Sequence, residues 1–287
     1  MKIIKDYNLS KSTTFHIGGI AKNLYIPEST EELIVLLNNE LTDNNHLYIL
    51  GGGSNLLIND NKIFENVIDT KEIDKSINNL SDGKYYIGCS NRIQNVVNEI
   101  NKDGYGGFEE LVSLPALFGG IIYMNAGIGS KNKSLFTISD FIDEVKVIDL
   151  KTKKIKWLKK EDCDFSHRQS IFQSNDYVIL GANIRVNKQD IKKSKERIRA
   201  RLEKTKKYER GKGCFGSCFA ESNSKLLKLV SILSLNKNGV YQSKNNGNWL
   251  VNDGNGTFVQ TMKIINKCKK IHKMFHKSIK CEVQIWE

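Results

Sequence analysis

The chain has 287 residues, of which 39 % are hydrophobic and 26 % are charged. This length and apolar content allow a sizeable core, which excludes wholesale disorder and suits one large domain or two to three lobes. No apolar run reaches the roughly 20 residues needed to span a bilayer, and the N-terminal segment turns polar after Ile4, unlike a signal peptide. We therefore expect a soluble, cytoplasmic protein with no membrane insertion.

The formal net charge is +12, from 44 Lys and Arg against 32 Asp and Glu. A positive field favours anionic partners such as phosphates, nucleotide-sugars or nucleic acid. The bases are spread along the chain, and the densest basic segment, 188–212, also contains Glu196, Glu203 and Glu209, as a solvated helix does. Charge alone therefore does not choose among these partners.

Cysteines and one histidine pair are the candidates for disulfide or metal chemistry. Six cysteines are thinly spread over the chain, which fits free thiols in a reducing compartment. Cys214 and Cys218 have no second pair at ligand spacing to complete a zinc site. His272 and His276 would share a face on a helix, but no carboxylate lies between them and the segment is rich in lysine. We expect no metal site.

The first two thirds of the chain show strand and helix patterns in turn. Residues with capping preferences, Ser29 to Glu32, predict the start of a helix whose apolar face is Leu33, Leu36 and Leu37. The alternation of apolar and polar residues on both sides of a lysine-rich turn predicts a hairpin. We expect strands at 23–27, 47–50 and 85–87, an apolar return at 56–58, a helix at 93–100, a Gly-rich stretch at 104–129, the hairpin at 145–158 and a buried strand at 177–185.

The composition shifts after Asn187, and we place a domain boundary there. The predicted domains are 1–78, 79–187 and 188–287. In the last of them we expect a long basic helix from 190 to about 208, a loop at 211–216, an apolar helix at 226–235, a strand at 248–251, a further helix and a final strand at 281–286.

The strongest local signal is the segment 50–57, Leu-Gly-Gly-Gly-Ser-Asn-Leu-Leu. Three glycines after a strand let the backbone approach a ligand closely and turn its N–H groups towards an anion, and Ser54 and Asn55 add side-chain donors. The segment lacks the Gly-Lys-Ser/Thr of a P-loop and does not open a helix as a G-x-G-x-x-G fingerprint does. A second Gly-rich run, 113–127, follows, and two such loops can clasp the two ends of a dinucleotide.

Six segments, in order along nearly the whole chain, carry a resemblance to a known family. They are 13–21 (TTFHIGGIA), 50–57 (LGGGSNLL), 113–129 (SLPALFGGIIYMNAGIG), 165–172 (FSHRQSIF), 216–219 (GSCF) and 281–283 (CEV). Together they resemble the motifs of the UDP-N-acetylenolpyruvoylglucosamine reductase family, flavoenzymes of peptidoglycan precursor synthesis. The length resembles that of the family's shorter subtype.

The resemblance implies an α+β fold. A two-lobed FAD-binding unit of the vanillyl-alcohol-oxidase type would comprise 1–78 and 79–187, and a C-terminal α+β substrate-binding domain would comprise 188–287. The implied activity is that of an oxidoreductase, a flavoprotein that uses FAD and NADPH to reduce UDP-N-acetylglucosamine enolpyruvate to UDP-N-acetylmuramate. This reaction serves cell wall biogenesis and hence cell shape, the cell cycle and cell division. We expect a monomer that takes these small molecules as partners and does not take nucleic acid.

The resemblance also implies site residues. Arg168 would hold the negative charge that develops on the substrate's carboxylate, Glu282 would orient the substrate or Arg168, and Ser217 would donate the proton. The implied FAD-binding residues are Ile49, Leu50, Gly51, Gly52, Gly53, Ser54, Asn55, Leu56, Ser113, Pro115, Ala116, Gly119, Gly120, Asn125, Ala126, Gly127 and Arg168.

Several positions depart from the family's pattern. His167 stands where tyrosine is usual, and Ala116 and Leu117 stand where glycine and threonine are usual. The segment 220–222 reads Ala-Glu-Ser for the family's Lys-Asn-Pro, and 243–249 lacks the family's lysine at the aligned place. These losses leave open a divergent paralogue that reduces another anionic unsaturated substrate. The net charge leaves open a third reading, a non-catalytic basic binding protein.

Overall fold

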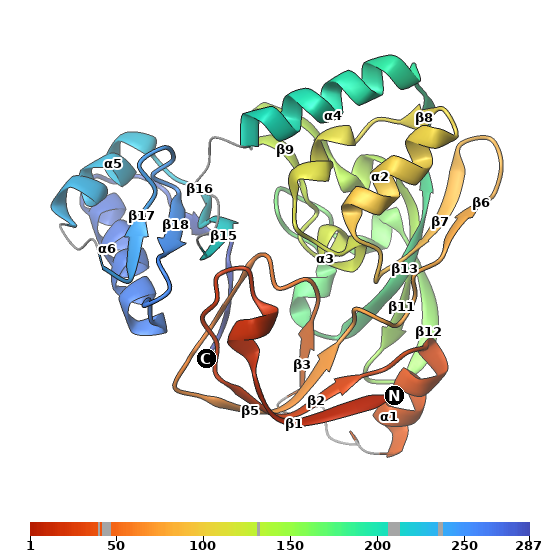
Figure 1. The fold of residues 1–287 in the computed structure, drawn as a ribbon, viewed down its shortest axis with the longest axis horizontal. Helices are drawn as coiled ribbons and strands as arrows, with labels where there is room; N and C mark the ends of the chain where they lie inside the picture. The colour runs from red at the N-terminus through yellow and green to blue at the C-terminus, as the bar shows by residue number, and fades with distance from the viewer. Residues whose placement is uncertain (40, 42–46, 131–132, 206–212, 235–237) are drawn as a thin grey trace. The chain divides into compact units, whose positions relative to one another are not determined.

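The computed structural model describes residues 1–39, 41, 47–130, 133–205, 213–234 and 238–287 (Figure 1). The chain divides into two compact units, each built from three segments. Unit 1 comprises Met1–Lys5, Lys22–Gly52 and Glu65–Lys204, and unit 2 comprises Asp6–Ala21, Gly53–Phe64 and Thr205–Glu287. The division into three domains at 78 and 187 stays a prediction.

Unit 1 contains a five-stranded antiparallel sheet in the order β12-β11-β13-β7-β6. Helix α2 (Ile93–Lys102) buries Ile93, Val96, Val97 and Ile100 at helical spacing, and it packs on the short helix α3 (Phe118–Tyr123), which contacts β7 and β13. The strands of the sheet are β6 (Ile77–Asn79), β7 (Lys84–Gly88), β11 (Ile142–Asp149), β12 (Lys154–Lys159) and β13 (Tyr177–Arg185).

A second sheet, in the order β1-β2-β5-β3, places the end of the first glycine loop. Strand β3 runs parallel to β5, and Thr70 fixes its last residue, because the Thr70 N–H and hydroxyl donate to the Leu50 carbonyl at 2.9 and 3.1 Å. The remaining elements of this part of the chain are β1 (Lys2–Asn8), β2 (Ile20–Ile26), α1 (Thr30–Asn39), β3 (Leu47–Leu50), β5 (Ile63–Asp69), β8 (Tyr105–Gly106), β9 (Gly127–Ser130), β10 (Lys133–Thr137) and β14 (Asn187–Lys188).

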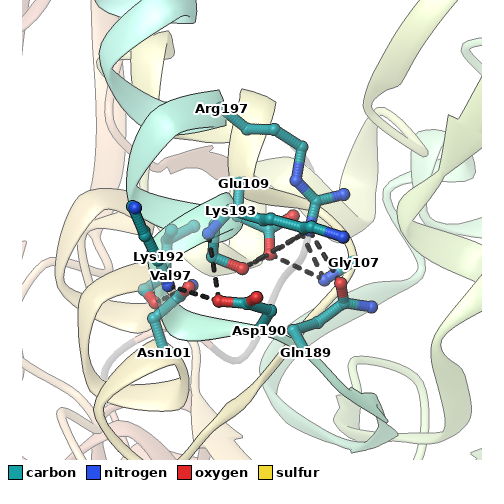
Figure 2. A network of polar contacts seen from close by, with 10 residues as sticks. Val97, Asn101, Gly107, Glu109, Gln189, Asp190, Lys192, Lys193 and Arg197 are labelled. Carbon is teal, nitrogen blue, oxygen red and sulfur yellow. Dashed lines mark hydrogen bonds and ion pairs between the residues drawn. The ribbon is translucent and has the colours of Figure 1, made fainter.

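Helix α4 (Ile191–Thr205) is anchored in unit 1 by a buried carboxylate (Figure 2). The Glu109 side chain is fully buried, and it accepts hydrogen bonds from the Ser194 hydroxyl at 2.7 Å and from Arg197 Nη2 at 2.9 Å. Both Glu109 carboxylate oxygens also lie 3.3 Å from the Gly107 nitrogen. A buried charge needs such partners, so these contacts hold one face of the predicted basic helix on the unit.

Unit 2 contains a three-stranded sheet in the order β15-β18-β17 and two further strand pairs, β16-β19 and β4-β20. Helices α5 (Ser224–Leu233) and α6 (Phe258–Met274) lie side by side (Figure 1). The core draws on all three segments of the unit, with Phe15, Leu57 and Phe215 buried in one cluster. The strands are β4 (Leu56–Ile58), β15 (Gly213–Ser217), β16 (Phe219–Glu221), β17 (Val240–Gln242), β18 (Trp249–Asn252), β19 (Lys280–Cys281) and β20 (Gln284–Trp286).

The predicted strands and helices are confirmed up to residue 205, but two predictions in unit 2 are wrong. The described part of the predicted loop, 213–216, belongs to β15, because Gly213 and Cys214 pair with a distant strand, β18. The predicted strand at 281–286 is broken after Cys281 into β19 and β20, which pair with β16 and β4 respectively. Residues 206–208, 211–212 and 235 of the predicted elements lie outside the described residues.

The two histidines of the pair, His272 and His276, lie at the end of α6 and just beyond it. His272 is fully buried, its Nδ1 lies 2.8 Å from the Cys268 carbonyl oxygen, and its Nε2 accepts from the Asn223 N–H at 2.9 Å. Both ring nitrogens are therefore used to join α6 to the start of α5, and His276 lies beyond the last residue of α6.

In the part of the chain that the structure describes, no helix is both long and apolar enough to cross a bilayer.

Candidate functional site

The two glycine loops approach each other within unit 1. A β-carbon at Gly52 would lie 3.1 Å from the Leu117 nitrogen and 3.4 Å from the Ala116 Cα, which explains why a residue without a side chain stands there. A β-carbon at Gly51 or Gly120 would instead meet no heavy atom of the described residues within 4 Å. The loops thus present bare backbone to open space, on the surface that the sequence predicts for a cofactor.

The second loop is held from behind by other parts of unit 1. The Ser113 hydroxyl donates to the Glu110 carbonyl at 3.2 Å and accepts from Arg201 Nε of α4 at 2.8 Å. The Gly119 N–H donates to the Cys89 carbonyl at 2.9 Å, and a β-carbon at Gly119 would lie 3.1 Å from the Cys89 Cβ. Ser113 and Gly119 therefore shape the loop from inside the protein.

Arg168 extends from a tight turn in which the backbones of Ser166 and Gln169 exchange two hydrogen bonds of 3.1 Å. Its φ of +58° is a left-handed conformation that non-glycine residues rarely adopt. The guanidinium donates to the Gly127 carbonyl at 2.8 Å and to the Asn125 carbonyl at 3.4 Å, and the buried Asn125 amide donates to the Ser166 carbonyl at 2.9 Å. Three predicted site residues, Asn125, Gly127 and Arg168, are therefore brought together.

Burial raises the pKa of Tyr123, at the end of α3, to about 12. Its phenol is therefore uncharged at neutral pH. The Tyr123 carbonyl accepts from the Ser170 hydroxyl at 2.7 Å and from Gln173 Nε2 at 3.3 Å. These contacts tie the segment after Arg168 to the end of α3, which precedes Asn125.

In unit 2 the first loop continues at Gly53, and here the fold itself requires glycine. The φ of Gly53 is +61°, and a β-carbon would lie 1.9 Å from the Ser12 carbonyl oxygen. The Gly53 carbonyl accepts from the Thr14 N–H at 3.1 Å. Gly53 is therefore fixed by its close approach to the segment 12–14, whatever ligand the loop takes.

Ser217 and Glu282 lie on neighbouring segments of unit 2. Strand β15 ends at Ser217, the Glu282 N–H donates to the Cys218 carbonyl at 2.8 Å, and the Asn55 amide donates to the Glu282 carbonyl at 3.0 Å. Both residues are half-buried. Among the described residues the Ser217 hydroxyl has no hydrogen-bond partner, and a β-carbon at Gly216 would meet no described heavy atom within 4 Å. The predicted proton donor thus has free space beside it.

Asn248 positions the chain after Ser217, a role that the sequence does not predict. Its Oδ1 accepts from the Phe219 N–H at 2.9 Å and its Nδ2 donates to the Phe219 carbonyl at 2.8 Å. Its own carbonyl accepts from the Cys218 N–H at 2.8 Å. No spacing rule indicates this residue, because its side-chain partner Phe219 is 29 residues away in the sequence.

Comparisons with known proteins show which family the chain resembles. Residues 21–159 match the model of a family described as an FAD binding domain. A UDP-N-acetylenolpyruvoylglucosamine reductase from Prochlorococcus marinus subsp. pastoris is 33 % identical over 258 residues, which are 86 % of this chain and 83 % of that protein. Another from Borrelia garinii subsp. bavariensis is 28 % identical over 275 residues, 91 % of this chain and 86 % of that protein.

A solved structure is similar over the whole length. The crystal structure of UDP-N-acetylenolpyruvylglucosamine reductase from Thermus caldophilus matches with a TM-score of 0.77 and 21 % identity, and the match covers 100 % of this chain and 98 % of that one. With the family model, this likeness confirms the predicted α+β fold with an FAD-binding unit. The six ordered motifs, the glycine loops and the similarity to the Prochlorococcus protein together show that the chain belongs to the UDP-N-acetylenolpyruvoylglucosamine reductase family.

Proposed function

We propose that this chain catalyses the NADPH-dependent, FAD-mediated reduction of UDP-N-acetylglucosamine enolpyruvate to UDP-N-acetylmuramate, a step of peptidoglycan precursor synthesis. The observation that carries the proposal is the similarity to the family over 83 % of a relative's length. When bound, FAD would supply the hydride chemistry between NADPH and the enolpyruvyl double bond, while the protein binds and orients the partners.

The two glycine loops fit a flavin dinucleotide. We assign FAD binding to the loop 49–56 and to the residues predicted within 113–127. Gly51 and Gly120 present backbone to open space, and backbone N–H groups in such loops suit a pyrophosphate. The Ser113 hydroxyl and the Asn55 amide have partners inside the protein, so we give these two side chains the role of shaping the loops.

Arg168 is assigned to the substrate's carboxylate. Reduction of an enolpyruvate at C3 develops negative charge on the carboxylate side of the molecule, and a guanidinium offers that charge a fixed fork of donors. Two of these donors are already bonded to the Gly127 and Asn125 carbonyls, which holds the side chain in one position. The left-handed backbone of Arg168 also supports a functional role, since such conformations gather at binding sites.

Ser217 is assigned as the proton donor at C2. Glu282 is assigned to orient the substrate. A serine hydroxyl is a weak acid, so it protonates only a strongly basic carbon and only when it is well placed. The support is local to unit 2: a Ser217 hydroxyl without a hydrogen-bond partner among the described residues, the space beside Gly216, and the hydrogen bond that joins Glu282 to the residue after Ser217.

One departure from the family's pattern has a role within the fold. Glu221, which stands where the family has asparagine, accepts a hydrogen bond from the Ser278 hydroxyl, so the fold itself engages this carboxylate. Several relatives carry the same reductase name, which favours the nucleotide-sugar over the divergent paralogue and over the basic binding protein.

We also propose that the enzyme is cytoplasmic and monomeric. All six cysteines are free, which suits a reducing compartment. Light scattering on a sizing column tests the monomer, and a mass near twice that of the chain would contradict it.

The visible absorption spectrum of the purified protein tests the proposed function. We expect oxidised-flavin bands that NADPH bleaches under anaerobic conditions and that the enolpyruvyl nucleotide-sugar restores. Bleaching without restoration would overturn the substrate and leave the reductase. The absence of flavin bands after addition of FAD would overturn the cofactor and the function together.

A further inference from the structure

Three cysteines of unit 2 gather beside Ser217 and Glu282. Cys218 lies between β15 and β16, Cys281 ends β19, and Cys268 lies on α6. Pairing of β16 with β19 sets Phe219 opposite Cys281, and the Glu282 N–H donates to the Cys218 carbonyl. Two of these thiols therefore adjoin, in the chain, the residues proposed as proton donor and orienting carboxylate.

The three thiols differ in charge and in exposure. The Cys218 thiol donates a hydrogen bond to the Cys281 sulfur, which, with help from the nearby Lys269 ammonium, lowers the pKa of Cys281 to about 7. Burial raises the pKa of Cys218 well above its usual range and that of Cys268 to about 12. Cys281 is half-buried, whereas Cys218 and Cys268 are fully buried. A partly ionised thiol on a half-buried residue thus lies against a protonated, buried thiol, which is the arrangement of an oxidisable cysteine and a resolving cysteine.

We propose that Cys281 and Cys218 form an oxidation-sensitive pair that hydrogen peroxide closes to a disulfide, and that the disulfide strongly slows turnover. The Cys281 thiolate attacks a peroxide oxygen, the O–O bond breaks, and sulfenic acid and hydroxide form; the hydroxide takes up the proton that the Cys281 thiol released on ionising and becomes the first water. The Cys218 sulfur then attacks the sulfenic sulfur, the S–O bond breaks, and the Cys218 proton leaves with the hydroxyl as water. Two thiols lose two electrons in total, and one peroxide is reduced to two waters.

The effect on turnover follows from what the two cysteines adjoin, and this part rests on the proposed function. A disulfide draws its sulfur atoms to about 2 Å, closer than a thiol–thiol hydrogen bond. The contraction moves the backbone at Cys218 and Cys281, and Ser217 and Glu282 are the next residues along the chain in each case. Displacement of a catalytic group by about 1 Å costs on the order of 100-fold in rate.

The experiment counts thiols and measures turnover on the same sample. The FAD-loaded protein is treated with hydrogen peroxide, quenched with catalase, unfolded in a maleimide and digested with trypsin. Starting from six free thiols, we expect four after oxidation and a disulfide between peptides 213–225 and 281–287. Turnover should fall about 100-fold and return with dithiothreitol. Because peptide 213–225 also contains Cys214, the control variant is Cys214→Ser, which should form the same link. Cys281→Ser should keep the basal turnover and resist peroxide.

Each other outcome overturns a defined part of the proposal. Six thiols after treatment, a link from Cys281 to Cys268, or loss of the link in Cys214→Ser would overturn the pair. A Cys218–Cys281 link with unchanged turnover would overturn the control of activity. If the link forms but the reduced protein never reduces the enolpyruvyl nucleotide-sugar, the pair stands and the proposed function fails.

Discussion

The three neighbouring glycines of the first loop have three different roles. Gly51 faces open space, Gly52 makes room for the backbone at Leu117, and Gly53 has a left-handed φ and lies against the Ser12 carbonyl. The sequence predicts that the backbone at this loop approaches something closely. It does not predict which glycine approaches a ligand and which approaches the protein, because all three have the same side-chain hydrogen.

Alanine at two of these positions should separate ligand binding from folding. Gly51→Ala should leave the thermal midpoint nearly unchanged and weaken FAD binding, because its β-carbon enters only the open space. Gly53→Ala should lower the stability by about 2 kcal/mol or more, because the new β-carbon strains the backbone and collides with the Ser12 carbonyl. Thermal unfolding of the flavin-free proteins and flavin titration measure the two effects. Equal flavin affinity in Gly51→Ala and the wild type would contradict the assignment of this loop.

Replacing Ser217 with alanine should separate reduction of the flavin by NADPH from reduction of the enolpyruvyl substrate. We expect normal bleaching of the flavin by NADPH and a loss of turnover of about 10²–10⁴-fold, the usual range for removal of a general acid. Stopped-flow absorbance measures both halves. Ser224→Ala, an exposed serine at the start of α5, is the matched control. Unchanged turnover in Ser217→Ala would show that another group donates the proton.

At the scale of the element, local patterns predict what local contacts build. The helix at 93–100 and the strand at 177–185 follow from their own residues, and the structure has them. Helix α3 is not predicted from the sequence, because it contains Gly119 and Gly120, and glycine has a low helix propensity. Strand β15 and the break between β19 and β20 are not predicted from the sequence, because the strands that pair with β15 and β20 are distant in the sequence.

The hairpin of β11 and β12 has a carboxylate at the end of β11, next to the turn, that should make stability depend on pH. Asp149 accepts from Lys156 Nζ at 2.6 Å and from the N–H groups of Lys151 and Thr152 at 2.9 and 2.8 Å. The hydrogen bond from Lys156, followed by that from the Thr152 backbone, lowers the pKa of Asp149 from 3.8 to about 2. Its contribution is therefore complete above pH 4 and disappears as the pH falls through 2.

Asp149→Asn should thus be less stable than the wild type at pH 6. The difference in the free energy of unfolding should shrink to about half at pH 3, as expected for a native pKa near 2. Urea unfolding at the two pH values measures it, with the exposed Asp162→Asn as the control. A difference that does not change with pH would mean that the carboxylate charge has no part in the effect.

Helix α4 should depend on the Glu109 carboxylate. Arg197→Ala leaves Glu109 fully buried with only the neutral donors of Ser194 and Gly107. We expect a loss of about 2–3 kcal/mol, below the usual cost of breaking a fully buried ion pair because the Arg197 side chain is 38 % exposed. Urea unfolding should show it, and the exposed Arg199→Ala of the same helix should change little. Equal stabilities of the two variants would contradict this anchoring.

At the scale of the whole molecule, each unit is assembled from three separate stretches of chain. The core of unit 2 includes Phe15 and Leu57 together with residues after 213, and its strand β4 pairs with β20. Sequence reading favours a continuous C-terminal domain, because a shift in composition is visible along the chain whereas a contact with a distant segment is not.

A fragment of residues 205–287 alone should therefore not fold. It lacks Phe15, Ile17 and Leu57 of the core and the partner of β20. We expect no cooperative thermal transition by circular dichroism, with the full chain as the control under the same conditions. A fragment that unfolds cooperatively would show that the last segment is a domain by itself.

The pairing of β4 with β20 also sets the order in which the protein matures on the ribosome. Asn55, beside β4, and its partner Glu282 are 227 residues apart, so β4 leaves the ribosome long before the strand that pairs with it has been made. During translation the edge of β4 therefore stays unpaired, and nascent chains with an unpaired strand edge bind chaperones or aggregate. Chains that a damaged message ends between residues 220 and 283 lack β20 and should therefore be inactive, although they contain both glycine loops, Arg168 and Ser217.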